Sequence, residues 1–299
     1  MHHSCVHIFG EVLFDHFPNG KAVLGGAPFN VACHLQALGY PPCLISRIGT
    51  DSEGAAVITA MQTRGMELSG MQQDDKFATG AVRIALNAGE PSYDILDNQA
   101  YDFISDKGKA TNITTGLFYH GSLALRNKVS RQSFEKLKAQ HHGKIFFDVN
   151  LRQPWWNKKE VLNWLDQANW VKLNLEEFHL LQSSPKNLHR SMKLFLKEHP
   201  IECLIVTCGK QGAIAINITG EEVEVKPNHE GVIIDTVGAG DAFASILMLG
   251  IYKNWPLTLS MDRAQAFASA IVGQQGATVS DMKFYQNFIN SWNSQDDST

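Results

Sequence analysis

Short apolar runs alternate with amphipathic segments along most of the chain. The runs have the length and composition of buried strands and are Val6–Phe14, Leu44–Ile48, Ile145–Val149, Trp170–Leu173 and Leu204–Thr207. Segments with helical spacing begin near Pro28 and near Glu53. Alternation of strands and helices favours a mostly parallel sheet with helices on both faces. The sequence therefore predicts an α/β fold.

Length and charge restrict the domain count and the partners. A chain of 299 residues can hold two ordinary domains, or one large α/β domain with a small appendage, and its hydrophobic content of 44% is ample for a core. Its 26 basic and 30 acidic residues give a net charge of -4 without a long basic block, so no nucleic-acid partner is expected. No run approaches the ~20 apolar residues of a membrane span, so no membrane partner is expected.

The cysteines and histidines indicate neither disulfides nor a metal site. The five cysteines form no CxxC pair, and the N-terminus has no secretory leader, so we expect reduced thiols and a cytoplasmic protein. Cys33 and Cys203 stand in apolar surroundings and are expected in the core. The twelve histidines are scattered without metal-ligand spacing and are treated as surface or core residues.

Three stretches depart from the α/β alternation. The stretch Thr79–Ile95 has strand-like residues on either side of a turn at Asn87-Ala88-Gly89, which predicts a β-hairpin inserted between α/β units. Residues 10–24 are expected to add strands to this hairpin. The last residues, 293–299, are expected to form a disordered tail.

A glycine-rich turn, Asp235–Phe243, carries the strongest chemical signal. A strand-like run, Val232–Ile234, precedes Gly238-Ala239-Gly240, which should open a helix with unpaired backbone N–H groups. Such N–H groups bind anions, and Asp241 stands in the first turn beside them. A Gly-x-Gly turn before a helix can also be a packing feature alone, and an acid there can simply favour its helix dipole.

The string Asp235–Phe243 resembles the signature of the ribokinase-like (PfkB) carbohydrate kinases. A second string, Gly25-Gly26-Ala27-Pro28-Phe29-Asn30-Val31-Ala32, resembles the sugar-binding segment of that family and stands in the same order. The resemblance runs from about residue 6 to about 290. It implies a ribokinase-like three-layer α/β/α fold with a mostly parallel central sheet. It also implies one kinase domain over 1–292, with a small β lid from about 10–24 and 76–104.

The resemblance implies ATP-dependent phosphoryl transfer to a sugar hydroxyl. In that family the residues equivalent to Gly238, Ala239 and Gly240 form the anion hole, and Asp241 is the catalytic base. The residues expected to bind the sugar are Asp15, Gly25, Gly26, Asn30, Arg83, Phe103 and Arg152. A carboxylate such as Asp15 can accept two hydroxyl hydrogen bonds, and the Asn30 amide can donate and accept. Taken singly, Asp15 is also an ordinary turn acid, Asn30 an ordinary helix-surface residue and Phe103 an ordinary core residue.

Two further strings resemble the nucleotide and magnesium elements of the family. Thr207–Gly212 resembles its Thr-x-Gly-x-x-Gly loop and must also be the turn that joins two strands, while Asn174–Glu177 resembles its Asn-x-x-Glu. The residues expected to contact ATP are Asn174, Thr207, Gly209, Gly212, Gly238 and Gly240. Glu177 would order the water shell of Mg²⁺, which dehydrates reluctantly, although it could also be a solvated helix start.

The family also has a monovalent-cation site beside the anion hole. The residues expected to form it, with K⁺ as the ion, are Asp235, Val237, Gln274, Gly276 and Ser280. A cation there would strengthen the field on the transferring phosphate. The chain has no GxxxxGK[ST], which argues against a P-loop kinase, and no GxGxxG after a strand.

The sugar is predicted from segments outside the signature. Gly10–Asp15, Ala100–Ile104 and Gly121–Arg126 look most like bacterial fructokinases, so the expected product is fructose 6-phosphate. Asp148–Arg152 resembles a family element written Asp-Pro-Asn-x-Arg, with Val149 in place of the proline. One alternative is a sister kinase acting on 2-keto-3-deoxygluconate or another sugar or nucleoside. The other is a catalytically silent sugar-binding or regulatory relative, against which the retained Asp241 argues. A homodimer through the lid is the family-like expectation.

Overall fold

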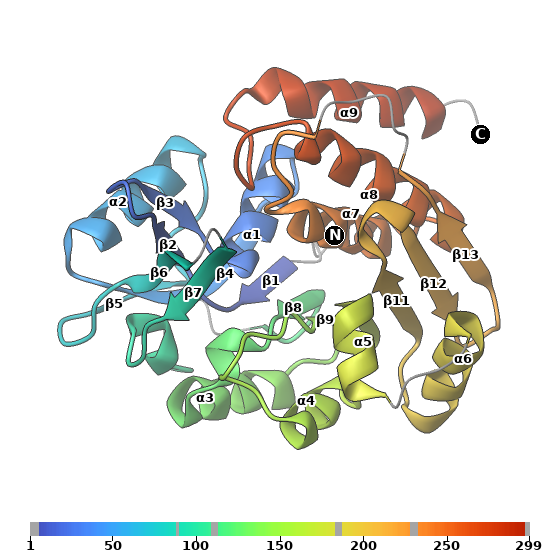
Figure 1. The fold of residues 1–299 in the computed structure, drawn as a ribbon, viewed down its shortest axis with the longest axis horizontal. Coiled ribbons are helices and arrows are strands. Elements are labelled where there is room, and N and C mark those ends of the chain that lie inside the picture. The colour runs from blue at the N-terminus through green and yellow to red at the C-terminus, as the bar shows by residue number, and fades with distance from the viewer. Residues whose placement is uncertain (1–5, 88–89, 109–112, 183–186, 228–232, 297–299) are drawn as a thin grey trace.

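The computed structural model describes residues 6–87, 90–108, 113–182, 187–227 and 233–296. Within these residues nine strands form one sheet in the order β13-β12-β11-β10-β9-β8-β1-β4-β5 (Figure 1). The strands are β1 (Val6–Phe9), β4 (Pro42–Gly49), β5 (Met71–Asp74), β8 (Leu117–His120), β9 (Lys144–Asp148), β10 (Trp170–Asn174), β11 (Cys203–Thr207), β12 (Ala213–Asn217) and β13 (Glu222–Val225). β12 pairs antiparallel with β11 and with β13, and the other pairs are parallel. The mostly parallel sheet is confirmed.

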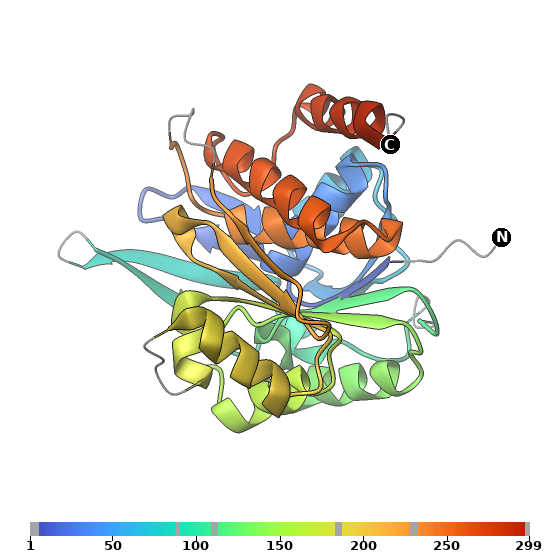
Figure 2. The same cartoon turned by 90° about the vertical axis from the view of Figure 1, so that its right-hand side faces the viewer.

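Helices cover both faces of this sheet, as Figure 2 shows. The helices of one face are α1 (Ala27–Ala37), α2 (Ser52–Thr63), α7 (Ala239–Lys253) and α8 (Leu257–Val272), with α9 (Met282–Asp296) packed outside them. The helices of the other face are α3 (Lys128–Ala139), α4 (Lys158–Leu165), α5 (Leu175–Leu181) and α6 (Leu188–Glu198). The three-layer α/β/α arrangement is therefore confirmed.

The central strands are apolar on both sides because each side faces a helix layer. Successive strand residues point to opposite faces, so Ile8 enters one core and Phe9 the other. The neighbouring strand repeats the pattern, with Leu44 and Ile45 in the same two cores. This double burial produces the continuous apolar runs in the sequence. Cys33 and Cys203 are buried in the core, as predicted.

A second, smaller sheet stands beside the main one. Its strands are β2 (Leu13–His16), β3 (Ala22–Gly25), β6 (Gly80–Asn87) and β7 (Glu90–Ile95), in the order β3-β2-β6-β7. The predicted hairpin is thus present, and Figure 2 shows β6 and β7 projecting from the body. Ala88 and Gly89 of its turn lie outside the described residues.

The first predicted strand is two strands in two different sheets. β1 ends at Phe9, and β2 begins at Leu13 after a short link. A Cβ on Gly10 would lie 2.2 Å from Cγ of Pro28, so the link passes directly against the start of α1. The prediction of one strand over Val6–Phe14 was therefore wrong, and Asp15, which follows this run, belongs to β2 of the small sheet.

The lid segment predicted at 76–104 extends too far. Ala100–Phe103 form a 3₁₀ turn, η1, which packs against the body of the molecule and whose first three residues are buried. Asp102 accepts hydrogen bonds from Nε and Nη2 of Arg126, at 2.7 and 2.8 Å, with both side chains almost fully buried. A buried ion pair of this kind holds η1 to the core, so the small sheet itself covers only 13–25 and 80–95.

Two predictions near the C-terminus also differ from the structure. Helix α9 continues to Asp296, so the predicted tail at 293–299 is helical over 293–296, and residues 297–299 lie outside the described residues. Ile233 and Ile234 form no strand, although the Ile234 amide donates to the Val272 carbonyl, and both side chains are exposed. Val232 lies outside the described residues. No helix in the described ranges has the length and apolar character needed to cross a membrane.

Asp51 connects the main body to the base of the small sheet. As the N-cap of α2, its carboxylate accepts from the Gly54 amide at 2.7 Å. It also accepts from the Thr79 amide at 2.8 Å and from the Thr79 hydroxyl at 2.7 Å, immediately before β6 begins. Burial acts to raise the pKa of Asp51, but these hydrogen bonds outweigh it, so the pKa is lowered.

Replacing Asp51 should destabilise the fold in a pH-dependent way. Asp51→Ala is expected to lower the free energy of unfolding by about 1–2 kcal/mol at neutral pH, measured by urea denaturation. Because the pKa is lowered by folding, this contribution is complete at neutral pH and should shrink below about pH 4. Asp75→Ala, at an exposed neighbouring position, is the control. Equal stability of Asp51→Ala and the control would contradict the account.

Candidate active site

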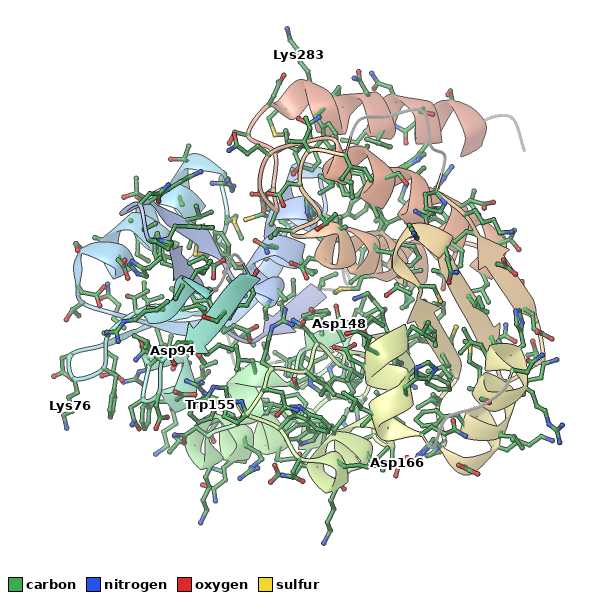
Figure 3. All side chains as sticks on the ribbon, viewed as in Figure 1. Lys76, Asp94, Asp148, Trp155, Asp166 and Lys283 are labelled. Atoms are coloured by element: carbon green, nitrogen blue, oxygen red, sulfur yellow. The ribbon has the colours of Figure 1, made fainter. Side chains whose placement is uncertain are left out.

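The candidate residues of three parallel strands meet at one edge of the main sheet. β9 ends at Asp148, β10 at Asn174 and β11 at Thr207. Asn174 and Thr207 are direct partners in the register of β10 and β11. The carboxyl edge of a parallel sheet is the usual place for a ligand site in α/β folds, because the strands deliver their loops there together. Figure 3 shows Asp148 near the middle of the molecule.

The glycine turn opens helix α7 as predicted. Gly238 is the N-cap, with φ 80° in the left-handed region. A Cβ at this position would lie 2.5 Å from Cα of Ala277, so both the conformation and the space require glycine. The N–H groups of the first helical turn have no partner within the helix, and those of Gly240 and Asp241 are among them. This geometry fits an anion.

Asp241 is joined to helix α1 by a hydrogen bond across 211 positions of sequence. The Asn30 amide Nδ2 donates to Asp241 Oδ2 at 2.8 Å. The Asp241 side chain keeps some exposed surface, but burial of its carboxyl and the nearby Asp148 raise its pKa to about 6. The Asn30 bond, Lys172 and Arg152 act in the opposite direction. The carboxylate is therefore ionised at neutral pH and a better proton acceptor than an ordinary aspartate.

Lys172 lies next to the turn Gly238-Ala239-Gly240, which we call the anion turn because its geometry fits an anion. The sequence analysis missed this residue. It is the register partner of Asp148, and its Nζ donates to both carboxylate oxygens at 2.9 Å. Both side chains are more than nine-tenths buried. A Cβ on Gly240 would lie 3.4 Å from this Nζ. Burial acts to lower the pKa of Lys172, but Asp148 outweighs it, so the pKa is raised and the ammonium keeps its charge.

The predicted sugar-binding glycines lie against acidic residues. A Cβ on Gly25 would lie 3.7 Å from Oδ2 of Asp15. Gly26 has φ 104°, and a Cβ there would lie 2.8 Å from the Glu11 carbonyl oxygen. A side chain at Gly26 would therefore displace the segment between β1 and β2, to which Glu11 belongs. Asn30 follows one helical turn later and is buried. The structure thus brings Asp15, Gly25, Gly26 and Asn30 together around the start of α1.

Arg152 is an exposed cation that acts on three acidic groups. Burial raises the pKa of Asp15 and that of Glu11, the latter to about 7, and Arg152 opposes both shifts. It also opposes the shift at Asp241. Glu11 was missed as an individual residue, although it stands within the predicted motif. A carboxylate one residue after a buried strand and its glycine is the signal that could have identified it.

Arg83 and Phe103, the two other residues predicted to bind the sugar, belong to β6 and to η1. Arg83 is exposed on β6, in register with His16 and Asp94. Phe103 belongs to η1 and stacks on Phe77, with ring centroids 3.8 Å apart. Arg83 thus lies on the strand next to the one that carries Asp15, and the roles of both residues in sugar binding stay predictions.

The loop predicted to bind the nucleotide is the connection between β11 and β12. It contains the short 3₁₀ turn η3 (Gly209–Gln211), and Gly209 and Gly212 both have positive φ, at 55° and 96°. A Cβ on Gly212 would lie 1.8 Å from the Val225 carbonyl oxygen, so this glycine is required by space. The loop leaves the sheet beside Asn174, the predicted ATP contact on β10.

Glu177 is buried, so its alternative reading as a solvated helix start was wrong. Its Oε1 accepts from the Leu151 amide and its Oε2 from the Asn174 amide, both at 2.8 Å, while Asn174 caps α5 in return. Burial raises its pKa. The described residues contain no group of three or more His, Cys, Asp or Glu side chains that could hold a metal. A Mg²⁺ bound through water and phosphate oxygens fits this donor set better than a protein cage.

Three of the residues predicted for a monovalent cation lie together. Asp235 Oδ1 accepts from the Val237 amide at 3.0 Å, and Oδ2 accepts from the Gly276 amide at 3.1 Å. Gln274 stands just after the C-terminus of α8, where its amide donates to the Ile271 carbonyl, and Ser280 is exposed. Asp235 therefore fastens the segment before the anion turn to the loop after α8.

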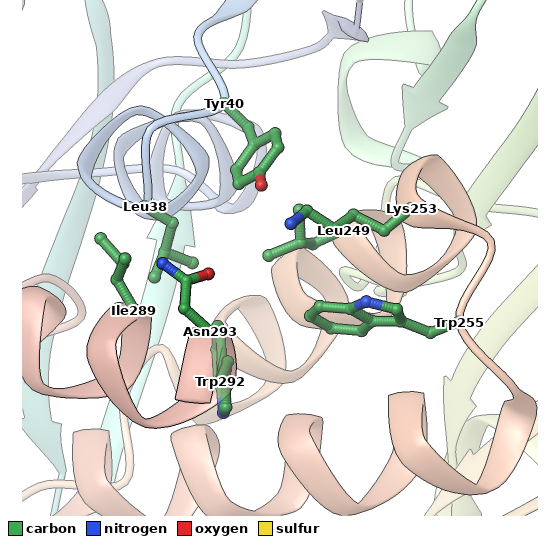
Figure 4. A pocket seen from close by; sticks show the side chains of 8 residues that line it. All are labelled: Leu38, Tyr40, Leu249, Lys253, Trp255, Ile289, Trp292 and Asn293. Carbon is green, nitrogen blue, oxygen red and sulfur yellow. The ribbon is translucent and has the colours of Figure 1, made fainter. Parts of the chain in front are cut away.

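A separate small pocket lies at the C-terminal ends of helices α1 and α7. Its lining, shown in Figure 4, is Leu38, Tyr40, Leu249, Lys253, Trp255, Ile289, Trp292 and Asn293. Leu38 caps the C-terminus of α1, and Lys253 ends α7. Because Asn30 and Asp241 stand in the first turns of these helices, this pocket is not the candidate site.

Comparison with known proteins gives one consistent family. The family model described as "pfkB family carbohydrate kinase" matches residues 6–283. Fructokinase from Escherichia coli is 30% identical over 266 residues, which cover 82% of this chain and 84% of the relative. The crystal structure of fructokinase from Vibrio cholerae O395 with fructose, ADP and calcium matches with a TM-score of 0.80 at 22% identity, over 97% and 98% of the two chains. That of aminoimidazole riboside kinase from Salmonella enterica, complexed with aminoimidazole riboside and an ATP analogue, gives 0.81 at 22% identity over 95% and 99%.

Removing one partner of the buried pair should cost more stability than removing both. Lys172→Met leaves Asp148 buried without a cation and should lower the free energy of unfolding by about 3–5 kcal/mol in urea denaturation. The double variant Asp148→Asn with Lys172→Met should recover a large part of that loss, because no unpaired charge remains. Lys158→Met, at an exposed position on α4, is the control. A double variant that loses as much as Lys172→Met alone would contradict the account.

Proposed function

The chain belongs to the pfkB family of carbohydrate kinases, a family of phosphotransferases acting on sugar hydroxyls, and on this premise we propose that it transfers the γ-phosphoryl group of ATP to D-fructose. The observation that supports the proposal best is the hydrogen bond from Asn30 to Asp241 at the N-terminus of α7. It holds a carboxylate of raised pKa beside unpaired helix N–H groups. A base and an anion site are the two parts that phosphoryl transfer needs close together.

In the proposed mechanism Asp241 accepts the proton of the attacking hydroxyl. The hydroxyl oxygen bonds to the γ-phosphorus as the bond from that phosphorus to the β,γ-bridging oxygen breaks, and ADP leaves with the electron pair. The N–H groups of Gly240 and Asp241 meet the charge on the transferring group. Gly238 and Ala239 give this turn its shape, since the left-handed Gly238 sets the direction of the helix.

Fixed groups around the start of α1 would orient the sugar. Asp15 and Asn30 are proposed to hold ring hydroxyls, with Gly25 and Gly26 allowing the backbone to approach. Arg152 is proposed to contact the substrate from the other side, since it already acts on Asp15 and Asp241. The identity of the sugar as fructose rests on the relatives named fructokinase.

The nucleotide is proposed to lie along the edge from Asn174 to the loop Thr207–Gly212. Glu177 would order the water around Mg²⁺, an ion that neutralises phosphate charge when bound. Asp235, Val237 and Gly276, with Gln274 and Ser280, are proposed to hold a K⁺ ion next to the anion turn. Its expected effect is electrostatic, because the ion would lie behind the N–H groups.

The small sheet is also a proposed surface for a homodimer. Two large side chains on this part of the chain are exposed, Phe17 at 38% and Tyr93 at 61%. Exposed aromatic side chains are enriched at protein interfaces. This supports a lid-to-lid association, which light scattering can measure.

The first test is a substrate panel for the wild type and Asp241→Asn. With ATP, Mg²⁺ and K⁺, turnover is expected on fructose and should fall by ~10²-fold or more in the variant. The other members are ribose, glucose, mannose, nucleosides and 2-keto-3-deoxygluconate. Asp262→Asn, at an exposed position on α8, should retain the wild-type rate. Turnover on another member would replace the substrate, and no turnover on any would favour a silent sugar-binding relative.

The pH dependence follows from the environment of Asp241. Because burial raises its pKa to about 6, kcat/KM should fall below about pH 6, where the base becomes protonated. Asn30→Ala removes a hydrogen bond that lowers this pKa, so the acid limb should move to higher pH. Asn163→Ala, an exposed position on α4, should leave the limb in place. A wild-type limb near pH 4, the ordinary range of aspartate, would contradict the assignment of the base.

A further inference from the structure

A buried histidine on α1 is not used by the proposed mechanism. His34 stands one helical turn after Asn30 and is fully buried. Its Nδ1 lies 3.1 Å from the hydroxyl oxygen of Tyr285 on α9, and the Phe267 ring packs at 86° to the His34 ring with 5.2 Å between the ring centroids. A polar ring in such a place needs partners on both nitrogens.

The Tyr285 hydroxyl makes two polar contacts. Its oxygen accepts a hydrogen bond from the Val279 amide at 3.3 Å and lies 3.1 Å from His34 Nδ1. Burial lowers the pKa of His34 to about 4, so the ring is neutral.

Tyr285 connects His34 to the loop after α8, because the Tyr285 oxygen that lies near His34 Nδ1 also accepts from the Val279 amide. The backbone of Ala277, in the same loop, acts on the pKa of His34 in the direction that favours protonation. His34 Nε2 has no hydrogen-bond partner among the described residues.

The loop 276–279 packs directly against the anion turn at Gly238. A Cβ on Gly238 would lie 2.4 Å from the Cβ of Ala277, so the two backbones are in direct contact. One residue earlier, the Gly276 amide donates to Asp235. Any shift of residues 276–279 is therefore passed to the turn that presents the N–H groups of α7.

We propose that His34 and Tyr285 are positioning residues that hold the 276–279 loop against Gly238 and so fix the N–H groups that receive the phosphoryl group. The proposal rests on the proposed function. Asn30 and His34 lie on one face of α1, four residues apart. One helix thereby sets both parts of the site: Asn30 orients the base, and His34 supports the anion turn.

The test uses variants that remove polar atoms but keep the rings. Tyr285→Phe deletes one oxygen, and we expect kcat to fall about 10-fold with the KM for sugar within about twofold, because misplaced N–H groups weaken the transition state and not sugar binding. His34→Phe should give a similar loss. The double variant should be no worse than His34→Phe, because the two residues act as one unit.

The matched control is Phe267→Leu, which loosens packing on the same ring without touching the hydrogen bonds. It should lower the midpoint of thermal unfolding and leave kcat unchanged. A loss of kcat in Phe267→Leu equal to that in Tyr285→Phe would overturn the proposal, since general loosening would then explain both.

A second readout does not depend on turnover. In Tyr285→Phe, amide hydrogen exchange should become faster at Gly276 and at Ala242, whose amides donate to Asp235 and to the Gly238 carbonyl. Exchange in the second half of α7, residues 246–253, should not change. If the wild type phosphorylates no sugar, the proposed function fails while this readout still tests the link. Unchanged exchange at Gly276 and Ala242 would overturn it.

Discussion

The hydrogen bond between Asn30 and Asp241 joins two helices that begin at opposite ends of the sequence. α1 and α7 pack against each other on one face of the sheet, and both point their N-termini to the same edge. The turn before α1 requires Gly26, and the turn before α7 requires Gly238, because a side chain at either position would collide with backbone. The site therefore depends on two glycine turns brought together by the packing of their helices.

Charge balance explains why so many ionisable groups can gather at this edge. Asp148 raises the pKa of Asp241, and the ammonium of Lys172 acts in the opposite direction. Arg152 acts on Asp15, Glu11 and Asp241 from the exposed side. Lys172 already has Asp148 as its counter-ion, so the buried ammonium is paired. An arriving phosphate would then meet N–H dipoles and a cation that are already fixed in place.

Local patterns in the sequence predicted the parts of the site that depend on nearby residues. The start of α7 at Gly238, the start of α1 at Gly26 and the loop from Thr207 are set by glycine and by helix periodicity, which are readable from sequence. The pairing of Lys172 with Asp148 depends on the register of two strands, which no local pattern contains. The split of Val6–Phe14 between two sheets and the burial of residues 100–102 depend likewise on tertiary contacts. The roles of Arg83 and Phe103 rest on the family resemblance and stay predictions.

The central claim is that the edge formed by Asn30, Asp241 and the Gly238 turn binds a sugar hydroxyl and a phosphate side by side. A crystal structure of the protein with fructose and a non-hydrolysable ATP analogue tests it most directly. The account predicts the terminal phosphate on the N–H groups of Gly240 and Asp241, with a sugar hydroxyl oxygen about 2.6–3.2 Å from the Asp241 carboxylate. A sugar bound away from Asp241, or a terminal phosphate bound away from the start of α7, would contradict it.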